Sequence, residues 1–420
     1  MAEQTSAAEP IRNWAGNVTF TPAELHRPAS LTELQSLVAR HEKVKVLGTG
    51  HSFNRIADTD GALVSLRDLP QVLELDTDRR LVRLGAGVRY GELAAFLHAH
   101  GLALPNLGSL PHISVAGACA TGTHGSGDAN PVLAAAVRAQ RLVTGDGELV
   151  ELAAGDPDFD GTVVALGALG AVTELTLQAV PAFELRQYVY DALPFDQLTA
   201  DLAEITAAAH SVSLFTRWRG DAVQAWLKSR EPRTGDFHGA RPADGPRHPM
   251  PDGDAGSATQ QLGVPGPWHR RLPHFRLEFT PSHGEEIQSE YFVDRAHGAA
   301  AVETVRSLGE LLAPVLLVGE LRTIAADEFW LSPCYQRDRL ALHFTWARDP
   351  AAVAPVLAEL ERRLAEFDAV PHWGKEFATA PHRLAELHPR LADFAALARR
   401  FDRAGTFGND FLHRRVLGGL

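Results

Sequence analysis

Residues 44–54 are the stretch that most constrains what this chain can fold into. An apolar-basic-apolar segment, residues 44–46, runs into a turn that contains Gly48 and Gly50 and then presents His51 and Ser52. Glycines adopt positive φ and approach ligands closely, and the unpaired N–H groups of such a turn form a concavity for phosphate oxygens. The stretch predicts a short strand followed by a loop that holds a pyrophosphate; an ordinary tight turn between strands is the alternative.

The loop does not fit the dinucleotide fingerprint of a Rossmann fold. That motif needs a third glycine at the start of a helix, and the corresponding position here is Phe53. The chain continues into residues 58–61, an Asp-Thr-Asp-Gly sequence of turn composition. The sequence therefore indicates a cofactor loop of a different kind.

A second glycine-rich region supports this interpretation. Residues 106–117 and 121–127 contain several glycines together with serine, threonine and histidine. Two such loops can clamp one long anion between them. We therefore expect both loops to bind the same cofactor.

The two loops resemble the FAD-binding domain of the vanillyl-alcohol oxidase superfamily, and nearly the whole chain resembles the alditol (xylitol) oxidases. The resemblance implies an α+β flavoprotein of two domains: residues 1–183 bind FAD, and residues 184–420 form an antiparallel-sheet substrate domain covered by helices. The segment near 405–411 is expected to return to the flavin. In this family the histidine of the first loop carries the flavin, so the resemblance implies a covalent link through His51.

The resemblance also implies which residues contact FAD. They come from both loops, from the start of a strand after residue 170, and from an H-W-G-K motif at residues 372–375. The expected cofactor contacts are Gly48, Thr49, Gly50, His51, Ser52, Phe53, Asn54, Ser109, His112, Ser114, Gly117, Ala120, Thr121, Gly122, Thr123, His124, Gly125, Gly170, Val172, His372 and Lys375. Two positions depart from the family pattern: Thr49, where serine is common, and Gly108, where alanine is common.

Two short segments of the second domain carry a group of polar residues. Glu320 and Arg322 lie two apart in one predicted strand, and His343 and Thr345 lie two apart in another. Because side chains alternate along a strand, each pair points to one sheet face. The segments predict a hydrogen-bonding floor suited to a polyol, with apolar residues between them on a buried opposite face; a solvated face with a surface ion pair is the alternative.

The resemblance implies catalytic roles for some of these residues. Arg322 and Lys375 are expected to lower the pKa of the bound hydroxyl, and His343 is a candidate proton acceptor, although the sequence does not decide which residue takes the proton. The substrate-binding residues are expected to be Ser109, Glu320, Arg322, Thr345 and Lys375.

Periodicity predicts the remaining elements. Residues 31–40 have helical spacing with Ser30 as N-cap, and Gly101 ends a second helix that begins near residue 90. The other expected elements are hairpins over 72–84 and 137–152, an alternating strand that follows the glycines of residues 167–170 and ends near Pro181, an irregular segment over 231–268, and helices over 351–367 and 390–401.

Composition limits the partners and the location. The 420 residues carry a net charge of −12, which argues against binding to nucleic acid or an anionic membrane. Cys119 and Cys334 are the only cysteines, so neither a disulfide framework nor a cysteine metal site is expected, and no metal is predicted. Residues 1–6 lack the pattern of a signal peptide, and no apolar run has the length of a membrane span, so a cytoplasmic location without a membrane anchor is expected.

The expected activity is an FAD-dependent oxidase that converts the terminal CH₂OH of alditols such as xylitol and sorbitol to the aldose and reduces oxygen to hydrogen peroxide. A sugar-1,4-lactone (L-gulono- or aldono-lactone) oxidase or dehydrogenase shares the histidine loop and the H-W-x-K motif and is the alternative. An NADPH-using reductase would need a nicotinamide site, for which the sequence offers no motif. A non-catalytic flavin protein would need neither Glu320 and Arg322 nor Lys375.

Overall fold

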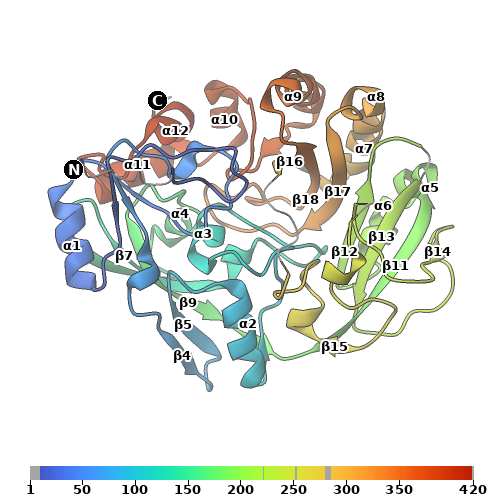
Figure 1. Ribbon diagram of the computed structural model, residues 1–420, viewed down its shortest axis with the longest axis horizontal. Coiled ribbons are helices and arrows are strands. Elements are labelled where there is room, and N and C mark those ends of the chain that lie inside the picture. Colours follow the sequence, from blue (N-terminus) through green and yellow to red (C-terminus); the bar gives the residue numbers. More distant parts are fainter. Residues whose placement is uncertain (1–9, 221, 251–252, 280–284, 419–420) are drawn as a thin grey trace, which may run out of the picture.

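The computed structural model describes residues 10–220, 222–250, 253–279 and 285–418. Figure 1 shows the N-terminal part of the chain on one side of the molecule and a large, strongly twisted sheet on the other. The strands of residues 24–178 and those of residues 184–371 belong to separate sheets. Between them, β10 (Val180–Pro181) pairs only with β6 (Leu102–Ala103). This division is compatible with a boundary near residue 183, but the domain limits stay a prediction.

The predicted strand before the histidine loop is β2 (Val44–Val46). It pairs in parallel with β3 (Ala62–Val64), which pairs in parallel with β1 (Glu24–His26). Helix α1 (Leu31–Arg40) connects β1 and β2, and the Ser30 hydroxyl accepts a hydrogen bond from the Glu33 N–H at 3.2 Å, as the N-cap prediction requires. This small parallel sheet positions the loop that follows β2.

An antiparallel sheet lies beside this parallel sheet. Its strand order is β4 (Leu73–Asp76), β5 (Leu81–Gly85), β9 (Ala171–Gln178), β7 (Val137–Val143) and β8 (Leu149–Ala153). The pairs β4 with β5 and β7 with β8 are the two hairpins expected from the sequence. Helix α2 (Tyr90–Ala99) was also expected, and Gly101 follows it with φ +72°.

The second glycine-rich region contains a helix that the sequence analysis missed. The sequence predicts glycine-rich loops over residues 106–117 and 121–127, but α3 (Val115–Ala120) begins inside the first of them. Its sequence, VAGACA, is short and holds a glycine, so it has no amphipathic period to recognise. A short α4 (Phe159–Thr162) precedes β9.

The large sheet is antiparallel, as predicted. Its order is β14 (Arg241–Pro242), β11 (Glu184–Pro194), β13 (Ala222–Ser229), β12 (Ser211–Thr216), β17 (Leu316–Ile324), β18 (Arg339–Ala347), β16 (Glu286–Asp294) and β19 (Val370–Pro371), and β15 (Gly266–Pro267) pairs with β11. In β17 and β18, Glu320 is directly opposite His343. The two polar pairs therefore share one face of this sheet.

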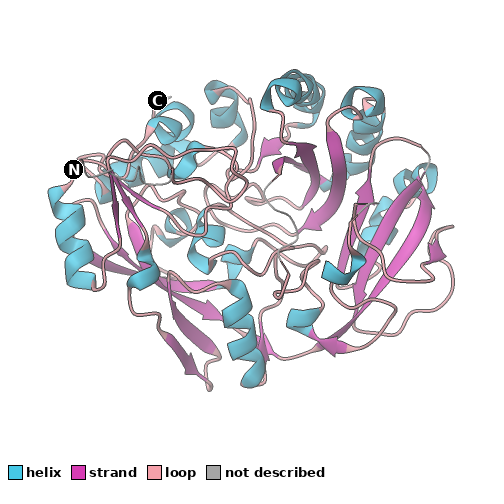
Figure 2. Cartoon of the chain, viewed as in Figure 1, coloured by secondary structure: helices cyan, strands magenta, loops and turns pink. Residues whose placement is uncertain are grey.

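Helices cover the other face, as Figures 1 and 2 show. They are α5 (Phe195–Ala200), α6 (Leu202–Ala207), α7 (Gly298–Arg306), α8 (Gly309–Leu312) and α9 (Pro350–Leu364). The residues between the polar positions, among them Leu321, Leu342 and Phe344, are at most 1% exposed. Burial of this apolar face fixes the register of β17 and β18 and keeps the polar residues on the opposite side.

The C-terminal segment returns to the N-terminal sheets. After α10 (Pro381–Leu387) and α11 (Leu391–Phe401), the Thr406 carbonyl accepts a hydrogen bond from the Val44 N–H at 2.7 Å. The Asn409 side chain, before α12 (Asp410–Leu412), donates to the carbonyls of Ile56 and Asp58 at 3.1 and 2.8 Å. The segment therefore packs behind the histidine loop.

Two further expectations can be compared with the structure. Within the described residues, no helix is long and apolar enough to cross a membrane. Cys119 and Cys334 are both buried and unpaired, so the chain has no disulfide.

Candidate active site

A cavity of about 370 Å³ lies where the N-terminal loops meet the polar face of the large sheet. The histidine loop, the second glycine-rich region, β16, β17, β18 and the H-W-G-K segment all contribute to its walls. Residues far apart in the sequence therefore line one continuous space.

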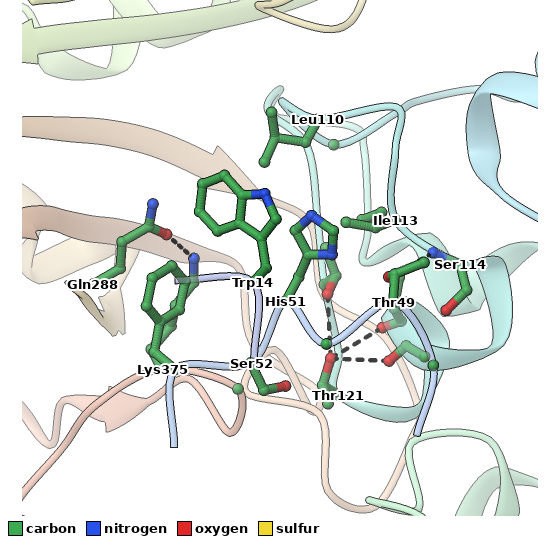
Figure 3. A pocket seen from close by; sticks show the side chains of 18 of the residues that line it. Trp14, Thr49, His51, Ser52, Leu110, Ile113, Ser114, Thr121, Gln288 and Lys375 are labelled. Atoms are coloured by element: carbon green, nitrogen blue, oxygen red, sulfur yellow. Dashed lines mark hydrogen bonds between the residues drawn. The ribbon is translucent and has the colours of Figure 1, made fainter. Parts of the chain in front are cut away.

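The histidine loop is held in a sharp turn. Gly50 has φ +70°, and its carbonyl accepts a hydrogen bond from the Trp14 N–H at 2.8 Å. The Trp14 and His51 rings stack, with centroids 5.2 Å apart and planes inclined by 18°. In Figure 3, His51 lies between the Gln288 and Lys375 side chains on one side and Thr49 and Ser114 on the other. Trp14 thus fixes the plane of the imidazole.

His51 has the properties needed for attachment of a cofactor. Its Nδ1 atom is buried, and among the described residues it has no hydrogen-bond partner. Burial lowers the pKa of His51 to about 4, and His112 and Lys375 add to this effect. The ring is therefore neutral near pH 7 and keeps a nitrogen that can bond to a ligand.

The two glycine-rich loops are packed against each other. The Ser114 N–H donates to Thr49 Oγ1 at 3.2 Å, and Ser114 Oγ lies 2.8 Å from where a Cβ on Gly48 would be. Thr121 Oγ1 hydrogen bonds to the Gly117 carbonyl at 3.2 Å. A side chain at position 48 would displace Ser114, so close backbone approach explains this glycine.

The histidine loop is also attached to the H-W-G-K segment. The Phe53 N–H donates to the Gly374 carbonyl at 2.8 Å, and Asn54 Nδ2 donates to the carbonyls of Trp373 and Lys375 at 2.8 and 2.6 Å. These bonds bring the Lys375 side chain to the cavity wall, where Nζ lies 4.9 Å from the centre of the Phe53 ring and donates to Gln288 Oε1. Burial lowers the pKa of Lys375 to about 8.

Arg322 is the central cation of the sheet face. Its Nη2 lies 2.8 Å from Glu290 Oε1, its Nη1 donates to Ser109 Oγ at 3.3 Å, and its Nε lies 3.5 Å from Glu320 Oε1. Burial by itself would lower the pKa of Arg322, but Glu320 and Glu290 outweigh it and raise the pKa. Arg322 therefore stays charged and connects the sheet to the second loop.

Glu290 is a residue that the sequence analysis missed. It is 1% exposed, and besides Arg322 it lies 3.2 Å from His124 Nε2 and 3.4 Å from His343 Nδ1. Burial acts to raise its pKa, but His124 and Arg322 hold it well below the usual range. The available signal was alternation in β16: Glu286, Gln288 and Glu290 all line the cavity.

The four predicted sheet residues are buried, so the alternative of a solvated face is wrong. Glu320 is 6% and Arg322 7% exposed, and His343 Nε2 lies 3.2 Å from Thr345 Oγ1. Burial lowers the pKa of His343. Its imidazole is therefore neutral near pH 7, as a proton acceptor must be.

Nearly all the predicted site residues line this cavity. His112, Gly122 and Gly125 do not: the His112 ring bonds to the Leu277 carbonyl at 2.8 Å, Gly122 lies against Pro333, and Gly125 lies against Asn106. The segment 405–411 also stays outside the lining. Lining residues that the sequence analysis did not single out include Trp14, His274, Gln288 and Glu290; apart from the alternation in β16, no local pattern distinguishes them.

Comparison with known proteins identifies the family of this chain. The sequence profile of an FAD binding domain matches residues 22–153, and that of D-arabinono-1,4-lactone oxidase matches residues 283–415. An alditol oxidase from Streptomyces sp. strain IKD472 is 54% identical over 97% of this chain and 99% of its own. The L-gulono-1,4-lactone dehydrogenase of Mycobacterium tuberculosis is 28% identical over 97% of this chain and 98% of its own.

A solved structure gives the same result for the fold. The crystal structure of cholesterol oxidase from B. sterolicum superimposes with a TM-score of 0.80, covering 97% of this chain and 96% of that one at 14% identity. The fold and the site define an FAD-binding oxidoreductase with the fold of the vanillyl-alcohol oxidase superfamily. Within that class, the chain belongs to the alditol oxidase family.

Proposed function

We propose that this enzyme oxidises the terminal CH₂OH of alditols, such as xylitol and sorbitol, to the aldose, with oxygen reduced to hydrogen peroxide. The observation that carries the proposal is that two cations, the buried Arg322 and the partly buried Lys375, line the cavity wall together with the hydroxyl-binding groups Ser109, Glu320 and Thr345. The wall offers both donors and acceptors, which a polyol needs for its hydroxyls.

The residues present fit FAD. The glycine turn allows close backbone approach, and the buried ring nitrogen of His51 has no partner among the described residues. We infer that His51 carries the flavin covalently and that the remaining loop residues lining the cavity hold the rest of the cofactor. The chemistry that bound FAD supplies is acceptance of a hydride from the alcohol carbon and two-electron reduction of oxygen.

The chain's own residues bind and activate the alcohol. Arg322 and Lys375 stabilise negative charge on the reacting hydroxyl oxygen, which lowers the pKa of that hydroxyl. His343, neutral and adjacent to Glu290, is the proposed proton acceptor. The remaining hydroxyls bind to Glu320, Thr345 and Ser109, and these contacts orient the substrate in the cavity.

Oxidation of a sugar-1,4-lactone is a second candidate. The match of residues 283–415 to the D-arabinono-1,4-lactone oxidase profile favours it. A lactone is also neutral and rich in hydroxyls, so the same wall would accept it.

The two functions separate in one experiment. The purified, flavin-loaded enzyme is mixed anaerobically with xylitol, sorbitol, glycerol or L-gulono-1,4-lactone, and flavin bleaching is followed, with peroxide release measured in air. We expect bleaching and peroxide with xylitol and sorbitol. Bleaching by the lactone alone would replace the proposal with the second candidate, and bleaching by none would reject both.

We also propose a cytoplasmic location. The chain's two thiols are free and buried, which suits a reducing compartment. Fractionation of source cells with an antibody against the protein tests this, and recovery in a secreted fraction would reject it.

A further inference from the structure

A fully buried lysine and a buried histidine lie behind Glu320. Lys228, on β13, is 1% exposed, and His274, in the irregular segment after β15, is 4% exposed. His274 lines the cavity, whereas Lys228 does not. Neither has a part in the function proposed above.

Lys228, His274 and Glu320 form a chain of hydrogen bonds, and the direction of each bond follows from the charge state of Glu320. His274 Nε2 lies 2.9 Å from Glu320 Oε1, and Lys228 Nζ lies 3.2 Å from His274 Nδ1. Arg322 and His274 hold the pKa of Glu320 well below its usual range against the effect of burial, so Glu320 is an ionised acceptor. Nε2 must then carry the proton, and Nδ1 must accept from Lys228.

The surroundings leave the imidazole little freedom to rotate. The Phe215 and Trp226 rings meet the His274 ring edge to face, with centroids 5.3 and 5.6 Å away. The backbone N–H of His274 donates to the Ser109 carbonyl at 3.2 Å, which anchors it to the second glycine-rich loop. Lys228 Nζ also donates to the Leu272 carbonyl.

We propose that Lys228 and His274 are positioning residues that fix the Glu320 carboxylate for recognition of a substrate hydroxyl. Lys228 selects the His274 tautomer with the proton on Nε2, and that N–H holds Glu320 Oε1. Among the described residues no hydrogen bond involves Glu320 Oε2, which leaves this oxygen to accept from a substrate hydroxyl. The inference rests on the proposed function, because it assigns the ligand of Oε2 as an alditol hydroxyl.

The role predicts an effect on binding rather than on the rate of the chemical step. A hydrogen bond to a hydroxyl away from the reacting carbon stabilises the ground state and the transition state equally. Loss of that hydrogen bond therefore raises the dissociation constant of xylitol and leaves the limiting rate of flavin reduction unchanged. A hydrogen bond to a charged group is stronger than one between neutral groups, so its loss weakens binding by roughly a factor of ten or more. We therefore expect at least a roughly tenfold weaker binding of xylitol.

The test uses the flavin-loaded enzyme under anaerobic conditions. Wild type and the variants Lys228→Met, His274→Leu, His274→Gln, Glu320→Gln and Lys228→Met/Glu320→Gln are mixed with a series of xylitol concentrations, which gives the dissociation constant and the limiting rate of flavin reduction. Lys228→Met and His274→Leu should weaken xylitol binding about tenfold with a limiting rate within about twofold of wild type. His274→Gln keeps an N–H donor near Nε2 and should restore much of the binding.

The double variant shows whether Lys228 acts through Glu320. If it does, Lys228→Met adds nothing once Glu320→Gln is present, whereas additive losses would overturn the inference. Loss of binding in Glu320→Gln but not in Lys228→Met or His274→Leu would overturn it while leaving the proposed function intact. Failure of wild type to reduce its flavin with any alditol would instead reject the proposed function.

A measurement on the wild-type protein covers the case in which Lys228→Met does not fold. In protein labelled with ¹⁵N-histidine, the ring shifts of His274, assigned by their loss in His274→Gln, should report a neutral ring protonated on Nε2 near pH 7. A ring protonated on Nδ1 would overturn the inference without any Lys228 variant.

Discussion

Asn54 donates a side-chain hydrogen bond to the backbone carbonyl of Lys375 at 2.6 Å. Residue 54 closes the histidine loop, and residue 375 carries a cation proposed to activate the substrate. A second bond from the same amide, to the Trp373 carbonyl, makes this contact rigid. The Asn54 amide and the Phe53–Gly374 backbone bond thus join the histidine loop to the segment that carries Lys375.

Removing this amide should loosen both loops. We expect Asn54→Ala to lose about 2 kcal/mol of unfolding free energy, because two buried carbonyls lose their donors, and to slow flavin reduction by alditols. Denaturant titration and anaerobic stopped flow measure the two effects. Asn54 Oδ1 also accepts from the Ile56 N–H, so Asn54→Asp, which keeps that acceptor, is the matched control. Wild-type behaviour of Asn54→Asp would assign the effect to the Ile56 contact instead.

The proposed covalent attachment of FAD to His51 can be tested directly. Wild-type protein denatured by acid or detergent should retain flavin fluorescence on a gel, and His51→Ala should release it. Trp14→Leu is a useful control, because it removes the stacked ring but not the nitrogen. Flavin that washes out of denatured wild-type protein would show that the link is not covalent.

Arg322→Ala and Lys375→Ala should each slow flavin reduction while the flavin remains bound. A loss of about 3 kcal/mol in transition-state stabilisation is expected, the usual order for one preorganised donor. Stopped-flow reduction by xylitol measures it. Arg219→Ala, which removes an exposed ion pair with Glu310, is the control and should be neutral. Unchanged reduction in both site variants would place the chemistry elsewhere.

The depressed pKa of Lys375 predicts a pH dependence. Burial lowers this pKa to about 8, so the lysine loses its charge as pH rises through that value. Because the charged form is proposed to stabilise the oxyanion, the limiting rate of flavin reduction should fall above about pH 8. Arginine keeps its charge, so Lys375→Arg should remove this decline whatever its absolute rate. A decline that persists in Lys375→Arg would belong to another group.

We expect the absence of a side chain at Gly108 to give oxygen access to the flavin. Its backbone lies outside the positive-φ region. A Cβ at this position would lie 3.7–3.9 Å from atoms of His124, Thr123 and Ile113, which are ordinary contact distances. A need for positive φ therefore does not explain this glycine. We expect Gly108→Ala to slow reoxidation by oxygen moderately and Gly108→Val strongly, with anaerobic reduction changed much less. Equal losses in both half-reactions, or loss of flavin, would reject oxygen access as the reason.

Local patterns predicted much of the fold. The Ser30 cap, the hairpins and the alternation of Glu320 with Arg322 are all encoded within a few residues, so the sequence suffices to place them. Helix α3 was missed because its six residues, which include three alanines and one glycine, show no helical period of hydrophobic residues. Its conformation is stabilised instead by packing against the histidine loop.

The site was harder to predict where the contacts are long-range. Glu290 lies next to Arg322 in space but 32 positions away in the sequence, and His274 is 46 positions from Glu320. Nothing local distinguishes His274 from other buried or surface polar groups, and for Glu290 the only local signal is the alternation of polar residues along β16. Resemblance supplied the residues of the known motifs, whereas the residues that support them emerge only from the strand pairing.

The bond between Val44 and Thr406 has a consequence for the synthesis of this protein. The strand before the histidine loop obtains its backbone partner Thr406 only after the large antiparallel sheet has been translated, and Lys45 bonds to a carbonyl 362 positions later. At 5–20 residues per second, the histidine loop waits on the order of 20–70 s for that partner. Covalent loading of flavin is therefore expected to follow translation rather than accompany it.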